Sequence, residues 1–416
     1  MKTTVALSLV AIGGAVCGAG IGVDRGHVVD SPFCEATPTR TDGRGIVRVR
    51  TVGALEDAIA RASPGDTILV HDGEYPLRRM LDISAARVTL RGASGDASVV
   101  VLRGAGMDDR EVGVALSISA PDVTVQDVTI GMVGFHAVQV RGERGASGFT
   151  LRRSHILDTG QQLIKGSTDG GPRFADRGQI TCSLIEYSSH APSDYTNGID
   201  ILAGEGWIVR DNVIRRVRGP EASRWSSGPA ILFWANSKDT LVERNVIVDS
   251  FRGIAFGLGP RASGNLARGG ESLYDHQGGW IRNNVIVNLN QWADEGIEVS
   301  SGRDVKIDHN TVLTLGSLPW SIGLRFPGTD GLVRNNLTSK PIALRDGGRG
   351  RLDNNVSDAD PRWFVDAAGA DLHVGPEGLA AIDRGMVIEE IREDFSGDSR
   401  ASGRLPDAGA FESRAR

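Results

Sequence analysis

The chain of 416 residues is poor in aromatic side chains and in lysine. Phe, Trp and Tyr make up 5% of it, and its 46 basic residues are nearly all arginines. The formal net charge is −6, so the chain lacks the basic excess that nucleic-acid-binding proteins carry. After the N-terminal region no apolar run approaches the roughly 18 residues of a membrane span. We therefore expect neither a nucleic-acid partner nor a membrane-spanning segment.

Cysteine is scarce as well, with three residues in the chain. Residues 5–22 are apolar or small and carry no charge, which is typical of a bacterial secretory signal peptide at 1–22. Cys17 offers a lipid-anchored alternative, which the preceding Val16 disfavours. In a secreted or periplasmic protein Cys34 and Cys182 could pair, but their wide separation leaves this pairing open.

Glycine is abundant, and so is one repeated phrase in which alternating apolar residues flank a polar pair with asparagine. Its spacing of about 20 to 40 residues indicates a repeat architecture. Asparagines at equivalent positions of stacked repeats can form a hydrogen-bonded ladder. We therefore assign a structural role, and no catalytic one, to the column Asn212, Asn245, Asn284, Asn310, Asn336 and Asn355.

A second repeated phrase lies between these asparagines. It is a small residue, then Ile, then any residue, an apolar residue and any residue, as in Gly198-Ile199-Asp200-Ile201-Leu202. Each repeat thus holds two or three short strands and has no room for helices. Stacked repeats of this kind bury one continuous interior. The sequence predicts an all-β fold, a single-stranded right-handed parallel β-helix, and it disfavours a propeller, which needs four strands per blade.

The boundaries of the protein follow from these patterns. Residues 54–62 have helical spacing and are expected to cover the N-terminal end of the solenoid. The repeat fades after Asp358, so the last segment is expected to cap the other end. We predict a signal peptide at 1–22, an N-terminal extension at 23–49, the β-helix at 50–357 and a C-terminal capping segment at 358–416.

Because strand side chains alternate, the second phrase also predicts which residues point outward. With each Ile inward, two outward columns form. Lys165 is expected about 4.8 Å from Asp200 on the next strand, provided that Gly166 points inward. The first column is Gln139, Lys165, Asp200, Leu232, Ala255, Glu298, Gly323 and Ala343, and the second is Arg141, Ser167, Leu202, Trp234, Gly257, Ser300, Arg325 and Arg345.

Long connections lead into this face, and long loops on a rigid scaffold commonly build binding walls. Exposed aromatic rings beside charged groups suit sugars, which have apolar faces and polar rims. We therefore expect a polysaccharide partner, anionic in character, and a monomeric protein. The expected substrate-binding residues are Tyr195, Trp234, Asn197, Glu298 and Arg345.

Cleavage of a uronic-acid glycan by β-elimination needs a base and positive charge near the sugar carboxylate. Lys165 is the candidate base, tuned by Asp200. A calcium ion held by Asp200 and Glu298 is a further expectation, because Ca²⁺ prefers oxygen ligands. The expected catalytic residues are Lys165, Asp200, Arg252, His276 and Arg325.

Two other functions remain open. A glycoside hydrolase would need two carboxylates, which Asp200 with Glu298, or Asp294 with Glu295, could supply. A carbohydrate-binding or surface β-helix protein would need no chemistry, and Lys165 and His276 could then be ordinary charged or polar positions.

The chain resembles the secreted bacterial β-helix proteins of the pectate-lyase-like superfamily. The run from Val52 to Ala60, with Pro64-Gly65-Asp66-Thr67-Ile68 and Asp72-Gly73-Glu74-Tyr75, is similar to the opening of the chondroitinase B and alginate lyase family. Residues 381–385, 394–400 and 407–412 look like the closing segment of many such proteins. The resemblance implies an extracytoplasmic protein acting on polysaccharides, with a lysine base aided by arginine and calcium. Lys165 matches that base in residue type and face.

Overall fold

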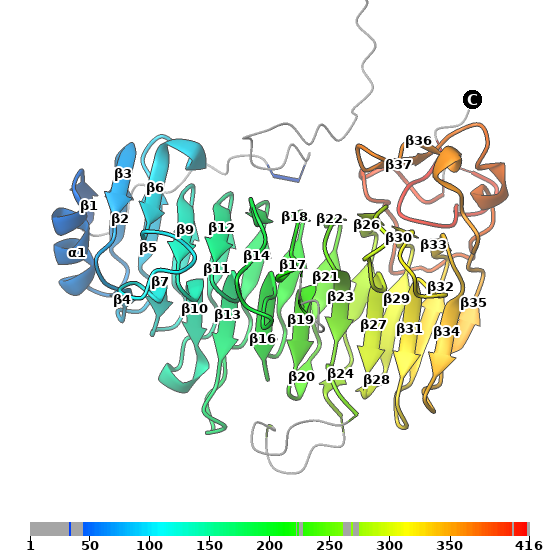
Figure 1. Ribbon diagram of the computed structural model, residues 1–416, viewed down its shortest axis with the longest axis horizontal. Helices are drawn as coiled ribbons and strands as arrows, with labels where there is room; N and C mark the ends of the chain where they lie inside the picture. Colours follow the sequence, from blue (N-terminus) through cyan, green and yellow to red (C-terminus); the bar gives the residue numbers. More distant parts are fainter. Residues whose placement is uncertain are drawn as a thin grey trace, which may run out of the picture.

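The computed structural model describes residues 33–34, 45–221, 223, 228–260, 268, 274–401 and 403–413. The predicted signal peptide, with Cys17, lies outside these residues. The chain winds into a right-handed parallel β-helix in which successive turns place their strands in three parallel sheets (Figure 1). The predicted fold class is therefore confirmed. No helix in the described part is long and apolar enough to cross a membrane.

The strands are grouped by sheet. Sheet 1 holds β1 Ile46–Val49, β2 Thr67–Val70, β5 Thr89–Gly92, β8 Thr124–Gln126, β11 Thr150–Arg152, β14 Gln179–Thr181, β17 Ile208–Arg210, β21 Leu241–Glu243, β25 Trp280–Arg282, β29 Val305–Asp308, β32 Gly331–Arg334 and β35 Arg351–Asp353. Sheet 2 holds β3 Gly73–Pro76, β6 Val100–Arg103, β9 Thr129–Val133, β12 His155–Thr159, β15 Leu184–Glu186, β18 Val213–Arg215, β22 Val246–Val248, β26 Val285–Asn288, β30 Thr311–Thr314 and β33 Leu337–Thr338. Sheet 3 holds β4 Leu81–Ile83, β7 Val114–Ile118, β10 His136–Arg141, β13 Ile164–Ser167, β16 Ile199–Leu202, β19 Pro229–Trp234, β23 Arg252–Phe256, β27 Ile297–Ser300, β31 Ile322–Arg325 and β34 Ile342–Arg345.

Short elements complete the chain. A small parallel sheet contains β20 Ser237–Lys238, β24 His276–Gln277 and β28 Gly302–Arg303, and β36 Phe364–Asp366 pairs with β37 Asp371–Val374 in antiparallel fashion. Besides the helix α1 Val52–Ala60 there are the 3₁₀ turns η1 Ala97–Val99, η2 Gly142–Arg144, η4 Pro361–Trp363 and η5 Leu379–Ala381.

The interior is a stack of aliphatic side chains, one above another in successive turns. The small residue and Ile of the second phrase put the Ile inward on each strand of sheet 3, where burial of each aliphatic side chain contributes roughly 1.5–3 kcal/mol. One such column, fully buried, is Ile164, Ile199, Ile231, Ile254, Ile297 and Ile322.

The N-terminal end is covered by α1, as the sequence predicts. Thr51 caps this helix by accepting a hydrogen bond from the backbone N–H of Ala54 at 3.2 Å. Leu55 and Ile59 on its inner face are buried against the first turn. Sheet 1 begins four residues earlier than the expected boundary at residue 50, because β1 pairs with β2. Cys34 forms a disulfide with Cys182 beside β14, so the pairing left open by the sequence is present.

The asparagine ladder is confirmed. Asn245 Nδ2 donates to Asn284 Oδ1 at 3.0 Å, and Asn284 Nδ2 donates to Asn310 Oδ1 at 2.9 Å. The residue before each ladder position has a left-handed backbone, such as Arg244 with φ 50° and Asn283 with φ 53°. The side-chain amides therefore satisfy the backbone at a tight bend that recurs in every turn between sheets 1 and 2.

The C-terminal segment does not cap the end of the solenoid, contrary to the sequence expectation. It lies along the outside of the molecule beside β26, β30 and β33 (Figure 1). The physical reason is that sheet 2 carries apolar residues on its outer face that need cover. Phe364, Leu372 and Phe411 pack there against Val246 and other residues of that face.

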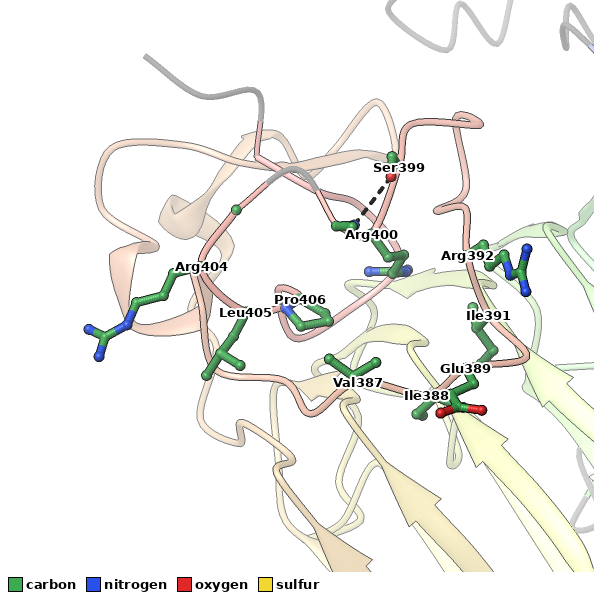
Figure 2. A pocket seen from close by; sticks show the side chains of 12 residues that line it. Val387, Ile388, Glu389, Ile391, Arg392, Ser399, Arg400, Arg404, Leu405 and Pro406 are labelled. Carbon is green, nitrogen blue, oxygen red and sulfur yellow. Dashed lines mark hydrogen bonds between the residues drawn. The ribbon is translucent and has the colours of Figure 1, made fainter.

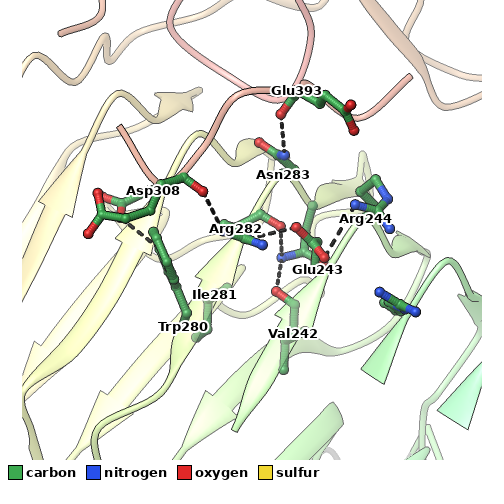
Figure 3. Close-up of polar contacts among 12 residues, drawn as sticks. Val242, Glu243, Arg244, Trp280, Ile281, Arg282, Asn283, Asp308 and Glu393 are labelled. Carbon is green, nitrogen blue, oxygen red and sulfur yellow. Dashed lines mark hydrogen bonds and ion pairs between the residues drawn. The ribbon is translucent and has the colours of Figure 1, made fainter. Parts of the chain in front are cut away.

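The last turn is left open instead. Leu344 of β34 is 44% exposed and Leu352 of β35 is 40% exposed. The C-terminal segment is fastened to the side of the coil by polar contacts: Asn283 Nδ2 donates to the Glu393 carbonyl at 3.0 Å (Figure 3), and Arg282 Nη1 donates to the Glu390 carbonyl at 3.3 Å. The segment thus packs where sheets 1 and 2 meet, beside the asparagine ladder, and leaves the outer face of sheet 3 free for a binding site.

Candidate active site

The first outward column of sheet 3 has the register that the sequence predicts throughout. The second has it at Arg141–Ser167, Leu202–Trp234 and Ser300–Arg325–Arg345. Gln139 pairs with Lys165, and Lys165 pairs with Asp200. Gly166 points inward, because a β-carbon there would lie 2.8 Å from Ile201 Cδ1 in the core. The columns also extend toward the N-terminal end, where Ser117 lies beside Gln139.

Lys165 and Asp200 form the centre of a first cluster. Lys165 Nζ lies 2.8 Å from Asp200 Oδ2 and donates to the Tyr195 hydroxyl at 3.0 Å. Asp200 is fully buried, whereas the Lys165 side chain is 12% exposed. A buried carboxylate needs a charged partner to offset the loss of water, so this ion pair fixes the ammonium group at the outer face.

Tyr195 and Trp234 complete this cluster. The Tyr195 hydroxyl also donates to Asp200 Oδ2 at 3.2 Å, and Trp234 Nε1 donates to Asp200 Oδ1 at 2.8 Å. Burial and the negative charge of Asp200 raise the pKa of the Tyr195 phenol above its ordinary value, so it stays protonated at neutral pH. Tyr195 comes from the connection into β16 and is 44% exposed, so its ring can meet a ligand.

A second cluster surrounds Glu298 on β27. Its carboxylate contacts Arg252 of β23, lies 3.7 Å from Arg325 and 3.6 Å from Arg345, and accepts from Ser300 at 2.9 Å. These three arginines are the ones that the sequence singles out, and the structure brings all of them together around Glu298.

Glu295 lies beside this second cluster; from the sequence it was named only with Asp294, as an alternative carboxylate pair for a hydrolase. It accepts from Trp320 Nε1 at 3.0 Å and lies 2.7 Å from Arg345. Burial and the nearby charge of Glu298 raise the pKa of Glu295 to about 8, and the arginines oppose this shift. Glu295 precedes the strand rather than lying on it, so the two-residue alternation could not place its side chain.

The two clusters lie apart. Three strand spacings, about 14 Å, separate Asp200 from Glu298, with Leu232 and Ala255 between them. These carboxylates therefore do not fit a calcium ion that both would bind, and each is already paired with cations. The described residues contain no group of three or more His, Cys, Asp or Glu side chains that could hold a metal.

Two other predicted residues lie outside both clusters. His276 is fully buried in β24, stacks on Phe256 with ring centroids 3.9 Å apart, and has Nε2 3.1 Å from Thr240 Oγ1. The ring therefore lies in the interior, and burial lowers the pKa of His276 to about 3. Asn197 is buried just before β16, with no hydrogen-bond partner for Oδ1 among the described residues.

His136 is a neighbour of the first cluster that sequence reasoning missed. It begins β10, its Nδ1 lies 3.1 Å from the Gln162 carbonyl, and burial with a contribution from the Lys165 charge lowers its pKa to about 4. A neutral imidazole thus lies beside Lys165. The strand begins before the repeated phrase does, so the pattern gave no signal for it.

A cavity of about 560 Å³ lies apart from this face, within the C-terminal segment (Figure 2). Val387, Ile388, Leu405 and Pro406 give it an apolar wall, and the chain around it has no repeat. Neither cluster contributes to its lining. Both clusters of the candidate site lie on sheet 3 and not at this cavity.

Three parallel sheets, a helical N-terminal cap and an amide ladder define a right-handed parallel β-helix. No protein-family model and no curated protein matches the sequence. Among solved structures, the chain is similar to pectate lyase Pel9A, with TM-score 0.58, 14% identity and coverage of 89% of this chain and 98% of that one. It is also similar to XylC, solved with xylose, with TM-score 0.50, 12% identity and coverage of 83% and 79%. An alginate lyase from Paenibacillus sp. str. FPU-7 aligns with TM-score 0.43 and 16% identity, covering 76% and 99%. At these identities the likeness shows the fold.

Proposed function

We propose that the protein is a polysaccharide lyase that cleaves an acidic, uronic-acid-containing glycan by β-elimination at the Lys165 cluster. The observation that carries the proposal is the position of Lys165 Nζ, held on the outer face between the phenol of Tyr195 and the carboxylate of Asp200. The similarity to pectate lyase Pel9A supports a glycan substrate. It supports no residue role, because identity is low.

The proposed reaction moves protons among three side chains, Lys165, Asp200 and Tyr195. Lys165 passes a proton to Asp200 across 2.8 Å, which leaves a neutral amine and a neutral acid. The amine takes the proton beside the sugar carboxylate, the electrons of that C–H bond form the new C=C bond, and the bond to the leaving oxygen breaks. Tyr195 donates its phenolic proton to that oxygen. A positioned proton-transfer group contributes about 10²–10⁴-fold.

The cluster then returns to its starting state without help from outside. Lys165 is an ammonium again, Asp200 is neutral and Tyr195 is a phenolate. The Asp200 proton moves to the phenolate oxygen, which lies 3.2 Å from Oδ2. The arginines around Glu298 are too far along the coil to neutralise the carboxylate of the reacting sugar, so we assign Arg252, Arg325 and Arg345 to binding of another sugar unit. No step in this scheme uses calcium, which stays a prediction.

A hydrolase is the second candidate, and one observation favours it. Glu295, with its raised pKa, could act as an acid beside Glu298 as a carboxylate. Both glutamates are at most 2% exposed and are covered by arginines. The Lys165 cluster, with an exposed phenol, is more accessible to a polymer.

We further propose that the protein acts outside the cytoplasm, since a disulfide such as Cys34–Cys182 persists in oxidising compartments.

The test is a panel of uronate polymers and neutral glycans incubated with the protein. Ultraviolet absorbance of the unsaturated product and reducing ends are both followed. Absorbance that appears with wild type and fails with Lys165→Arg supports the lyase. Reducing ends without absorbance would move the assignment to hydrolysis at Glu295 and Glu298. Retention of a glycan with neither product would make the protein a binding module.

A further inference from the structure

A basic cavity of about 570 Å³ continues the outer face of sheet 3 on the N-terminal side of Lys165. Its floor comes from the same columns as the first cluster: Asp82 of β4 is in register with Ser117, which is in register with Gln139, beside Lys165. The cavity is lined by Met80, Asp82, Ser84, Ser119, Arg141, Arg144 and Arg173. It lies within about three strand spacings, or about 14 Å, of Lys165.

Three arginines therefore face one aspartate. Asp82 accepts a hydrogen bond from Ser119 Oγ at 2.6 Å. Arg141 is held by its contact to Ser117 Oγ at 2.9 Å and lies 3.7 Å from Glu143. Arg144, at the end of η2, and Arg173 have no ion pair or hydrogen bond among the described residues. Within the described part of the chain, two guanidinium groups thus have no paired carboxylate.

We infer that this cavity is a subsite for an anionic sugar substituent, a carboxylate or a sulfate, on a unit of the chain next to the cleaved region. The guanidinium group binds such oxyanions through paired N–H donors. The inference rests on the proposed function, because it uses the same bound polymer. It adds that the substrate carries negative charge on more than the reacting unit, and that it runs from Lys165 toward β4.

The test compares two double variants that remove equal charge. Arg144→Ala/Arg173→Ala changes the subsite, and Arg61→Ala/Arg351→Ala changes two arginines that are 81% and 71% exposed elsewhere. Dissociation constants are measured by titration with a polyuronate and with a sulfated glycan that contains no uronic acid, at low and high salt. Loss of two exposed charge pairs predicts about three- to thirtyfold weaker binding for the subsite variant, a smaller salt dependence and little change for the control.

The two glycans distinguish which anionic group the cavity binds. Weakening for the polyuronate alone identifies a carboxylate, for the sulfated glycan alone a sulfate, and for both a general oxyanion site; each supports the subsite. Equal affinities of the two double variants would overturn it, even if wild type forms unsaturated product. Failure of wild type to bind either polyanion would overturn it too. Weaker binding by the subsite variant without product from wild type would keep the subsite and reject the lyase.

Discussion

Lys165 and Trp234 bind opposite oxygens of the same buried carboxylate, that of Asp200. Lys165 Nζ lies 2.8 Å from Oδ2, and Trp234 Nε1 lies 2.8 Å from Oδ1. The carboxylate plane is thereby fixed from both sides, on strands β13 and β19 that flank β16. A fixed carboxylate also fixes the direction in which the lysine presents its protons, so the cluster is rigid before any ligand binds.

Replacing Lys165 should cost both activity and stability. Lys165→Ala leaves Asp200 buried without its cation, which predicts a loss of about 3–5 kcal/mol in the free energy of unfolding. Lys165→Arg keeps the charge but does not readily release a proton, so turnover should fall at least about a hundredfold while most of the stability is retained. Product absorbance and denaturant unfolding measure the two effects. Full turnover in Lys165→Arg would remove the proposed mechanism.

Tyr195→Phe separates proton donation from packing. The substitution removes the hydroxyl group that contacts Lys165 and Asp200 and keeps the aromatic ring. Turnover is expected to fall about ten- to hundredfold, and the free energy of unfolding should change by about 1 kcal/mol or less, because the ring is 44% exposed. Tyr274→Phe is a matched control outside the first cluster. Equal turnover in the two variants would show that Tyr195 is not the proton donor.

Asn245→Ala should destabilise the β-helix without changing the activity of the folded protein. Asn245 Nδ2 donates to Asn284 Oδ1 and to the Val209 carbonyl at 2.9 Å, and its Oδ1 accepts from Asn212. Loss of these bonds leaves buried groups unsatisfied, so we expect roughly 2–4 kcal/mol lower stability. Activity per folded molecule should be unchanged. A variant that melts like wild type yet has lost turnover would contradict the structural role of the ladder.

Glu295→Gln should flatten the dependence of stability on pH. The pKa of Glu295 in the folded protein, about 8, is higher than in the unfolded chain. Its proton therefore stabilises the fold fully below about pH 4.5, and this contribution is lost as the pH rises through 8. Glutamine does not titrate, so the variant should lose less stability than wild type between pH 5 and about 8.5.

Urea unfolding at a series of pH values measures this difference. Glu389→Gln, at an exposed position, is the matched control. Parallel curves for wild type and Glu295→Gln would mean that Glu295 is ionised throughout this range.

The sequence predicts those parts of the molecule that repeat. Period-two alternation and the recurring Ile placed Lys165 next to Asp200, because parallel strands of equal phase stack in register. The ladder followed from the same periodicity. Tyr195 was expected at a binding face, but its hydrogen bond to Lys165 depends on a loop conformation that no period encodes.

The errors have the same origin. His276 belongs to a two-residue strand, too short to show alternation, and its burial on Phe256 could not be anticipated. The C-terminal segment has no repeat, so its preference for the outer face of sheet 2 over the open end depends on tertiary packing. Glu295 lies just before β27, and His136 is the first residue of β10, so both lie where the alternation starts.

The ladder is also a row of dipoles. Each amide from Asn212 to Asn336 donates in the same sense, toward the amide of the following turn, and the row ends at Asn355. Aligned dipoles polarise one another, so an inner link is stronger than a terminal link. Cutting the row at Asn284 would therefore weaken two half-rows at once, whereas removing Asn355 would only shorten it. Mechanical pulling along the coil axis would then meet its greatest resistance in the middle turns and its least at the last one.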